Sequence, residues 1–523
     1  MNRSTRAVIV AAASFALTAA ALALSATDAG AKTLRWAGRG DMQTTDPHSQ
    51  NENLTNNINQ LIYEFLLVRD KKLNLLPALA ESWTKVNDTT WRFKLRPGVK
   101  FHDGTPFTAD DVVFSFERAR SDTSQLRAYA NASGIPKKID DLTVEFTTTG
   151  PNPIELEHIA TINIMSKAWC EKNRATKPQN YTQKEDMITA HQANGTGPYM
   201  LKTREPDVKT VLTKNPDWWG LREKRFEGNA DEVVYTPIVS DATRVAALLS
   251  GEVDLVNDPP PQDVPRLKQT QGIKVLEGTE NRIVFIGMDQ ARDELLYSNV
   301  KGKNPFKDKR VRQALYQAVD IEAIKKNTMR GLSQPSGAML PSPLTTTPAV
   351  EKRLPYDKEA AKKLLAEAGY PNGFSTELVT YDLQQWAGAV QGYLKAVGID
   401  ASITRLQVAA VVQRSIAGQN PMELGSWGSY SVNDVSAILP NYFTFTGNDY
   451  TRDPEIKKLV EAGSATVDPD QRRKAYTAAI KSITEKASWI PVFTHTVTYG
   501  FSKQLSFKPY PDELPRFFLA SWK

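Results

Sequence analysis

Residue types that commonly carry out chemistry are few in this 523-residue sequence, and they do not cluster. No two of the five histidines lie within four residues of each other, so no local metal-binding pair exists; they are His48, His102, His158, His191 and His495. The single cysteine, Cys170, can form no intramolecular disulfide, and we expect it to be a small core residue. The sequence therefore predicts no metal site and no cofactor.

Sequence motifs of enzymes are also missing. The chain contains no H-E-x-x-H, no G-x-S-x-G and no G-x-x-x-x-G-K-[ST] motif. Gly195-Thr196-Gly197 begins like a dinucleotide-binding motif, but Pro198 and Tyr199 follow and the third glycine is absent, so we expect a turn that leads into a strand. A catalytic triad assembled from distant residues stays open, since such residues need not be adjacent in sequence. Nothing points to one, and the sequence predicts a protein that is not an enzyme.

The charge of the chain is mildly basic, at +6. Lysine and arginine are scattered among aspartate and glutamate, and a basic surface that binds nucleic acid would show a clustered stripe. We therefore expect a solvated surface of mixed charge and no nucleic-acid partner.

Two periodicities alternate along the chain. Residues 91–95 and 142–146 have the period-two pattern of half-buried strands, while residues 283–286 form a continuous apolar run that is typical of a strand covered on both faces. Turn dipeptides at 97–98 and 103–104 bracket a further short strand. Helical stripes follow at residues 311–319, 361–368 and 476–483, the last after a capping signal at 468–471, and residues 108–111 mark the start of a further helix. This order of elements predicts an α/β fold.

The first 31 residues are predicted to be an export signal. Arg3 and Arg6 precede an apolar run from residue 7 to about 26, and Ala29-Gly30-Ala31 offers small residues where a signal peptidase cleaves. The alternative is an uncleaved membrane anchor, since the run is long enough to span a bilayer. No cysteine follows the cleavage site, which argues against a lipid anchor. We expect cleavage after Ala31 and a soluble periplasmic protein.

The remaining chain, roughly 490 residues, is too long for one hydrophobic core and predicts two or three lobes. Proline-rich stretches at 259–265 and 335–355 have no sustained periodicity. Each is either a linker or a long loop on the surface of a lobe.

Short blocks in a fixed order carry a resemblance to a known family. They are residues 46–48, 79–83, 91–112, 195–199, 215–220, 244–255 and 308–320. This ordered set resembles solute-binding family five, the peptide- and nickel-binding proteins of ABC importers, over nearly the full mature length.

The resemblance implies a two-lobed periplasmic-binding-protein (Venus-flytrap) fold with an extra inserted subdomain. Residues 1–31 would be the signal peptide. The first lobe would combine 32–65, 195–285 and 497–523, with the inserted subdomain at 66–194, and the second lobe would span 286–496. Chain crossings between the lobes would form a hinge, and a ligand in the cleft would favour the closed state.

The resemblance also implies where the ligand binds. One group of contacts follows the Asp-Pro-His block and corresponds to Asn51, Glu52 and Asn53. The second is a tryptophan-containing turn of the second lobe, which corresponds to Trp427, Gly428, Ser429 and Tyr430. The alternatives are a solvated loop before a helix for the first group and a core aromatic for Trp427.

One position departs from the family pattern. Peptide binders of this family place an aspartate three residues after that tryptophan, where it pairs with the α-ammonium of the ligand, and this chain has Tyr430 there. A buried ammonium without a partner costs several kcal/mol. Either Asp434 or Glu52 replaces the missing group, or the ligand has no free amine and stacks on Tyr430 and Trp427.

The predicted function is that of the substrate-binding component of an ABC importer, with a peptide or peptide-like ligand. Its partners would be permease subunits in the inner membrane and, through them, the ATPase subunits, and we expect a monomer. The alternatives are a binder of an amine-blocked, aromatic or metal-chelate solute and, from another class, a secreted hydrolase. No histidine lies between His191 and His495, which argues against a nickel site near the cleft turn.

Overall fold

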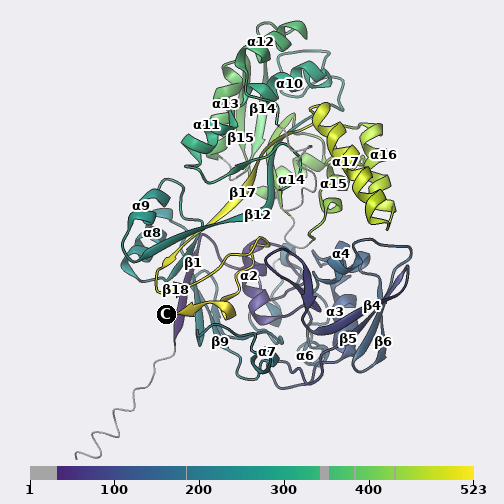
Figure 1. The fold of residues 1–523 in the computed structure, drawn as a ribbon, viewed down its shortest axis with the longest axis vertical. Coiled ribbons are helices and arrows are strands. Elements are labelled where there is room, and N and C mark those ends of the chain that lie inside the picture. Colours follow the sequence, from purple (N-terminus) through teal and green to yellow (C-terminus); the bar gives the residue numbers. More distant parts are fainter. Residues whose placement is uncertain (1–31, 184, 342–352, 382–383, 429–431) are drawn as a thin grey trace, which may run out of the picture.

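The protein forms two lobes joined by long strands (Figure 1). The structure is a computed structural model, and it describes residues 32–523 except 184, 342–352, 382–383 and 429–431. The predicted signal peptide and the middle of the proline-rich stretch at 335–355 therefore lie outside the described residues. We use "lower lobe" and "upper lobe" as Figure 1 draws them.

One large mixed sheet runs through both lobes. Its strands lie in the order β15 (Ile399–Arg405), β14 (Phe374–Thr380), β16 (Met422–Gly428), β12 (Ile273–Met288), β17 (Ile490–Ser502), β11 (Leu255–Asn257), β1 (Thr33–Gly38), β10 (Glu232–Pro237), β9 (Lys209–Lys214) and β8 (Tyr199–Glu205), and β13 (Gln334–Pro335) pairs with β17. The antiparallel pair of β12 and β17 extends from Ile273 opposite Ser502 to Ile286 opposite Ile490. These two strands connect the lobes.

The apolar run at 283–286 occupies the centre of this sheet, as predicted. β12 pairs with β16 on one side and β17 on the other, and each of the four side chains is at most 1% exposed. The upper lobe packs its helices around this part of the sheet in two hydrophobic clusters. The helices are α10 (Lys309–Ala318), α11 (Ile321–Ala323), α12 (Lys358–Glu367), α13 (Gln384–Lys395), α14 (Val408–Ile416), α15 (Leu439–Phe443), α16 (Pro454–Ala465) and α17 (Pro469–Glu485).

The lower lobe holds a second, smaller sheet with its own hydrophobic cluster. Its strands lie in the order β4 (Ala80–Asn87), β5 (Thr90–Leu95), β7 (Thr143–Thr147) and β6 (Ile135–Asp140), and the hairpin β2 (Leu67–Arg69) and β3 (Leu75–Pro77) stands apart, as does the pair β18 (Leu505–Ser506) and β19 (Ser521–Trp522). The helices of this lobe are α2 (Asn53–Ile62), α3 (Ala109–Ala119), α4 (Arg127–Ala132), α5 (Glu155–Ile159), α6 (Lys167–Lys172), α7 (Trp219–Arg222), α8 (Asp241–Ser250) and α9 (Val264–Gln269).

Local signals in the sequence account for many element boundaries. Thr108 is the N-cap of α3, and its backbone N–H donates to the carboxylate of Asp111 at 2.9 Å. Asp468 caps α17 and accepts from the backbone N–H of Gln471 at 2.9 Å. Cys170 is fully buried, in agreement with the prediction of a core residue.

Gly195-Thr196-Gly197 leads into strand β8, as predicted, but the chain forms a bend at residues 197–198 in place of the predicted turn. The backbone N–H of Gly197 donates to the carbonyl oxygen of Ile62 at 2.8 Å, and a Cβ on Gly195 would lie 2.0 Å from that oxygen. Glycine is required here because the chain passes directly against the end of α2. The fragment of a dinucleotide motif is therefore a packing feature.

One predicted strand is wrong. Between the turns at 97–98 and 103–104 the chain forms only an isolated bridge between Lys100 and Pro106. The segment instead follows the lower lobe through single hydrogen bonds, such as that from the backbone N–H of His102 to the carbonyl oxygen of Gly195 at 2.8 Å. Two closely spaced turns leave too few residues for a ladder.

Candidate functional site

The strands that connect the lobes contain an irregularity at the point where β12 leaves one lobe and enters the other. The register is Thr279 opposite Thr496 and then Ile283 opposite Thr494, so Glu280, Asn281 and Arg282 oppose a single residue, His495. Such bulges bend a strand and re-aim its side chains. β16 begins to pair with β12 at this same point, through Gly428 opposite Arg282.

Charged side chains from four separate parts of the chain converge on this bulge. We call Asp258, Glu280, Arg282, His495 and Glu513 the junction cluster. The carboxylate of Glu280 accepts from Nδ1 of His495 at 2.8 Å and from Nε of Arg282 at 3.3 Å. Glu280 and Glu513 are hydrogen-bonded to each other, and each is at most 4% exposed.

The junction cluster shifts the pKa of each of its acids in a different way. Burial and the neighbouring Glu280 raise the pKa of Glu513 well above its usual range. Burial alone would raise the pKa of Glu280, but His495 and Arg282 hold it below its usual range. Burial and Glu280 raise the pKa of Asp258 to about 6. Of these two neighbouring acids, Glu513 therefore holds a proton more tightly than Glu280 does.

The upper lobe also contacts the lower lobe directly. The backbone N–H of Asn433, in the segment after β16, donates to Oε2 of Glu157 in α5 at 3.1 Å. Oε2 of Glu157 also accepts from Arg69 at 2.6 Å, and Asn433 Oδ1 accepts from Nδ2 of Asn281 at 3.2 Å. The region where the two lobes meet therefore includes the bulge of β12.

The first predicted group of ligand contacts lies at the start of α2. The carboxylate of Glu52 caps this helix and accepts from the backbone N–H groups of Leu54 at 2.9 Å and Thr55 at 3.0 Å. Asn51 accepts from Nδ2 of Asn56 at 3.0 Å. Asn53 reaches the junction cluster, because its Nδ2 donates to Oε2 of Glu513 at 2.7 Å.

The second predicted group lies at the end of β16. Trp427 is half-buried against a hydrophobic cluster of the upper lobe and stands opposite Ile283. A Cβ on Gly428 would lie 2.9 Å from Cζ of Arg282. Ser429 and Tyr430 lie outside the described residues. The structure thus places Gly428 beside the junction cluster.

Asp434 has partners within the upper lobe. Its carboxylate caps the short 3₁₀ helix Val435–Ala437, accepts from Ser436 and pairs with the guanidinium of Arg472. The described contacts of Asp434 are therefore those of a cap and an ion pair.

The sequence analysis did not single out the members of the junction cluster as ligand-binding residues. Their positions are far apart, and no local spacing connects residue 258 with residues 280–282, 495 and 513. One signal was available: the polar triplet Glu280-Asn281-Arg282 directly precedes the apolar run of β12, and a polar interruption in such a strand indicates a bulge.

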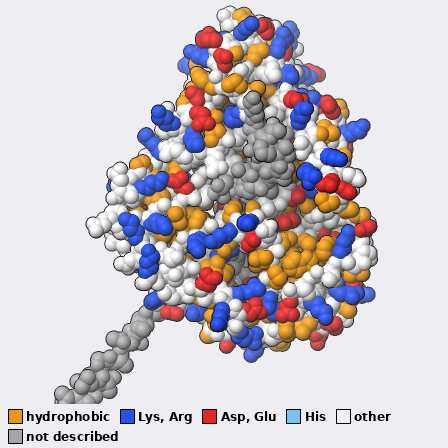
Figure 2. Space-filling view, in the orientation of Figure 1, with side chains coloured by type: hydrophobic (Ala, Val, Ile, Leu, Met, Phe, Trp, Pro, Cys, Tyr) orange, Lys and Arg blue, Asp and Glu red, His pale blue; other side chains and the backbone are white. Residues whose placement is uncertain are grey.

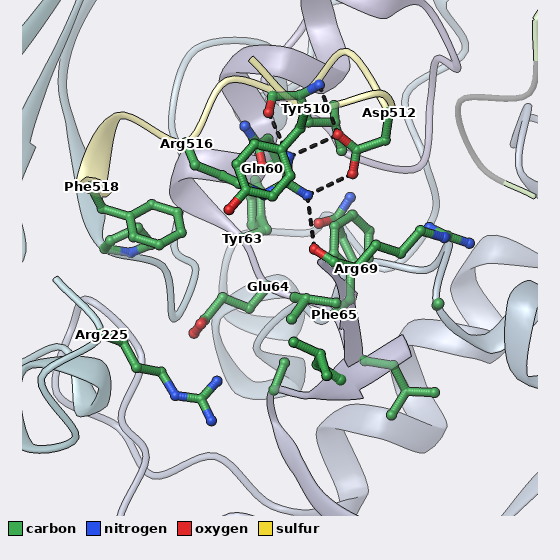
Figure 3. Close-up of a pocket in the computed structure, with 18 of the residues that line it drawn as sticks. Gln60, Tyr63, Glu64, Phe65, Arg69, Arg225, Tyr510, Asp512, Arg516 and Phe518 are labelled. Atoms are coloured by element: carbon green, nitrogen blue, oxygen red, sulfur yellow. Dashed lines mark hydrogen bonds and ion pairs between the residues drawn. The ribbon is translucent and has the colours of Figure 1, made fainter. Parts of the chain in front are cut away.

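A cavity of about 380 Å³ lies beside α2 in the lower lobe (Figure 3). Tyr63, Phe65, Tyr510 and Phe518 are among the rings that line it, and Asn51 also belongs to its lining. Arg516 stacks over Tyr510, with Cζ 3.9 Å from the ring centroid. The cavity therefore offers aromatic surfaces to an apolar group.

One wall of the cavity carries a buried carboxyl group. Glu64 accepts from the indole N–H groups of Trp218 at 3.2 Å and Trp219 at 2.9 Å. Burial raises the pKa of Glu64 to about 7. Arg225 also lines the cavity, and its Nη1 is held by the carbonyl oxygen of Pro77 at 2.9 Å.

Two kinds of feature are absent from the described part of the chain. Outside the gaps named above, no three His, Cys, Asp or Glu side chains come together in a way that could hold a metal ion. Over the same residues, no helix has both the length and the apolar character needed to cross a membrane. Figure 2 shows basic and acidic side chains interspersed over the visible face.

Two lobes, a pair of connecting strands and charged side chains at their junction define a binding protein of the hinged, two-lobed class. The sequence model of the bacterial extracellular solute-binding proteins, family 5 (middle region), matches residues 74–450. The chain belongs to this family.

Known proteins similar to this chain cover nearly all of it. Glutathione-binding protein GsiB of Shigella flexneri is 28% identical over 497 residues, which is 91% of each chain. The periplasmic binding protein DppA from Helicobacter pylori, solved with the peptide STSA, has a TM-score of 0.77 at 23% identity and covers 94% of this chain and 98% of its own. AgaA of A. tumefaciens R10, solved with agropinic acid, has a TM-score of 0.73 at 25% identity. The match covers 93% of this chain and 96% of AgaA. The structural likenesses confirm the two-lobed fold.

Proposed function

We propose that this chain is the substrate-binding component of an ABC importer and captures a peptide or peptide-like solute between its lobes. The observation that carries the proposal is the meeting of both lobes at the bulge of β12, where charged side chains and the predicted residues Asn53 and Gly428 come together. A solute that contacts both lobes only when they close stabilises the closed state.

The similar proteins support a peptide-like solute. GsiB is named for glutathione, and DppA was solved with a tetrapeptide. Peptides have charged ends and polar backbone groups, which suit a site of ionisable and amide side chains. The chain lacks local catalytic motifs, and we propose that it binds without catalysis.

The cavity beside α2 would hold an apolar side chain of the solute. Asn51, a predicted contact, is one of the residues that line the cavity, and the volume of the cavity exceeds that of any single side chain. Roomy pockets accept varied side chains.

Mass spectrometry of solutes that co-purify with the protein, followed by calorimetry with the candidates, tests the proposal. We expect one bound solute per chain, of peptide or peptide-like composition. Steady turnover of a peptide library would contradict binding without catalysis and favour the secreted hydrolase.

An amine-blocked solute is the second candidate. The observation that favours it is Tyr430, which stands where the family resemblance implies an aspartate. Preferential binding of N-acetylated over free peptides would support this candidate, and Tyr430→Ala should then weaken binding by about 1–4 kcal/mol without lowering the stability of the unliganded protein.

Export and assembly complete the proposal. The chain would be cleaved after Ala31, act as a periplasmic monomer and dock on permease subunits, with lobes divided as the sequence predicted. Sequencing the mature N-terminus tests the cleavage, and retention of Met1 in the membrane fraction would contradict it.

A further inference from the structure

We propose that Glu513, Glu280 and Asn53 form the acceptor for a positively charged amine of the bound solute. The inference rests on the proposed function, because it names the group of the peptide-like solute that the lobe junction recognises. The two acids offered by the sequence are already engaged, since Glu52 caps α2 and Asp434 pairs with Arg472.

Two acids of the junction cluster, Glu280 and Glu513, are buried side by side, whereas Asp258 is exposed. The two cationic side chains of the cluster, Arg282 and His495, both donate to Glu280. Two neighbouring buried carboxyl groups do not readily ionise together, because their like charges repel. Glu513 must therefore either keep a proton or receive a further cation.

Charged groups around the cluster do not supply that cation. Arg244 faces Asp258 but pairs with Asp241 at 2.5 Å. Asp512, which lies near the phenol of Tyr499, pairs with Arg516 at 2.6 Å. The other titratable groups that face the cluster among the described residues are the phenols of Tyr381, Tyr442 and Tyr499, and a phenol has no cationic form.

Asn53 provides an independent observation. Its Nδ2 donates to Glu513, which fixes the orientation of the amide, and its Oδ1 is buried and accepts no hydrogen bond from any described residue. A buried acceptor of this kind is costly unless a donor reaches it. An ammonium group has three donors, which match this oxygen and the carboxylates of Glu513 and Glu280.

Binding would replace a proton on Glu513 with the ammonium group of the solute. The ammonium of the solute enters beside Glu513, the shared proton leaves Glu513 for the solvent, and the total charge of the cluster does not change. Solutes with a free amine should therefore bind with release of about one proton, whereas N-acetylated solutes should release none.

Calorimetry in buffers of different ionisation enthalpy measures this proton count. The probes are reduced glutathione and the dipeptide Met-Leu, each with a free and an N-acetylated amine, in phosphate and Tris at pH 7.5. We expect free-amine probes to bind at least about tenfold more tightly than their acetylated forms. Glu513→Gln should abolish proton release and reduce this preference to less than about threefold.

Two further variants separate the ammonium site from a purely structural effect. Asn53→Ala should weaken free-amine probes while proton release persists. Glu155→Gln, at a carboxyl group that is 1% exposed and outside the cluster, should leave affinity and proton release unchanged. Melting curves of each unliganded variant show that it is folded.

The possible failures are distinguishable. Free-amine probes that bind without proton release, with their preference intact in Glu513→Gln, would overturn the inference and leave the proposed function standing. If neither these probes nor any member of a di- to pentapeptide library binds the wild-type protein, the proposed function fails and the ammonium site fails with it.

Discussion

Two ionic clusters of this protein differ in how completely their polar groups are paired. In the lower lobe, Asp46, His48 and Arg118 form what we call the scaffold cluster, and the Asp46 and Arg118 side chains are fully buried. In the junction cluster only Glu280 and Glu513 are almost as deeply buried, while the other members are partly or fully exposed. Burial of a carboxyl group alone therefore does not distinguish a structural ion pair from a binding site.

The scaffold cluster satisfies its charged groups. Arg118 forms two hydrogen bonds to Asp46, at 2.5 and 2.8 Å, and donates to the carbonyl oxygens of Ala175 and Lys177. Asp46 also accepts from the backbone N–H of Gln179 at 3.0 Å. A carboxylate and a guanidinium paired in this way leave no place for a ligand.

The junction cluster lacks this closure, since Asn53 Oδ1 accepts no hydrogen bond from a described residue, and burial beside Glu280 raises the pKa of Glu513. The cluster lies on the strands between the lobes, where a solute would supply the missing donor. We infer from the comparison that incomplete pairing of polar groups, rather than depth of burial, indicates the recognition site.

The largest effect is expected from breaking the scaffold cluster. Arg118→Leu leaves the carboxylate of Asp46 buried without its partner and should lower the free energy of unfolding by about 3–5 kcal/mol. Urea denaturation measures this loss. Arg127→Leu, which removes an exposed pair with Asp122, should cost less than about 1 kcal/mol. Similar losses in the two variants would contradict the balance assigned to the scaffold cluster.

Acidification should also destabilise the lower lobe. Burial lowers the pKa of His48 and His102 to about 4, so both are neutral in the folded protein and become protonated on unfolding between pH 6.5 and 4. Stability is then lost as the pH falls through this range, by on the order of 3 kcal/mol for each histidine. Asp46, with a pKa of about 2, loses its contribution only below pH 4.

Variants assign this loss to particular side chains. In urea titrations from pH 7 to 4.5, His102→Gln should reduce the proton uptake on unfolding by roughly one. The control is His191→Gln, which removes an imidazole from an exposed position beside Asp186. An unaltered slope in His102→Gln would show that this histidine is not held neutral.

Sequence patterns predicted the scaffold better than the recognition site. The strands at 91–95, 142–146 and 283–286 and the caps at Thr108 and Asp468 are confirmed, because each depends on residues adjacent along the chain. The predicted strand after residue 97 failed where turn signals stood too close together. The described structure does not test the ligand contacts, which stay predictions.

The junction cluster could not be predicted because its members meet only through the tertiary fold. Asn53 was expected to contact ligand from the family resemblance, but its hydrogen bond to Glu513 joins residues 460 positions apart. The contact between two buried carboxyl groups is a property of the assembled group and has no local sequence pattern. From the sequence, Glu52 and Asp434 were equally suitable to replace the missing aspartate. The structure shows that each of them caps a helix.

The junction cluster should respond to pH in the opposite direction to the scaffold cluster. Burial and the neighbouring Glu280 raise the pKa of Glu513, so the folded protein binds this proton more tightly than the unfolded chain does. The free energy of unfolding therefore falls as the pH rises above the usual pKa of a glutamate. Glu513→Gln retains the neutral form and should make the unliganded protein more stable than wild type at pH 8. Melting temperatures at pH 6 and 8 measure this, and a variant less stable at both values would contradict a protonated Glu513.

The smallest expected effect concerns the geometry of the junction cluster without a change of charge. The Cβ of Gly428→Ala would lie 2.9 Å from Cζ and 3.0 Å from Nη2 of Arg282, closer than such atoms approach in proteins. The guanidinium ends a flexible side chain, so it can shift by a few tenths of an ångström at a cost of less than about 1 kcal/mol. That shift alters its contacts with Glu280 at 3.3 Å and Ser426 at 3.2 Å.

Calorimetry should therefore show a few-fold weaker binding of free-amine peptides to Gly428→Ala, with a nearly unchanged melting temperature. Gly392→Ala on α13, where nothing lies within 4 Å of the added carbon, should change neither. Equal affinities in both variants would mean that the position of Arg282 does not matter to recognition, and the site would then depend on the carboxyl groups and Asn53 alone.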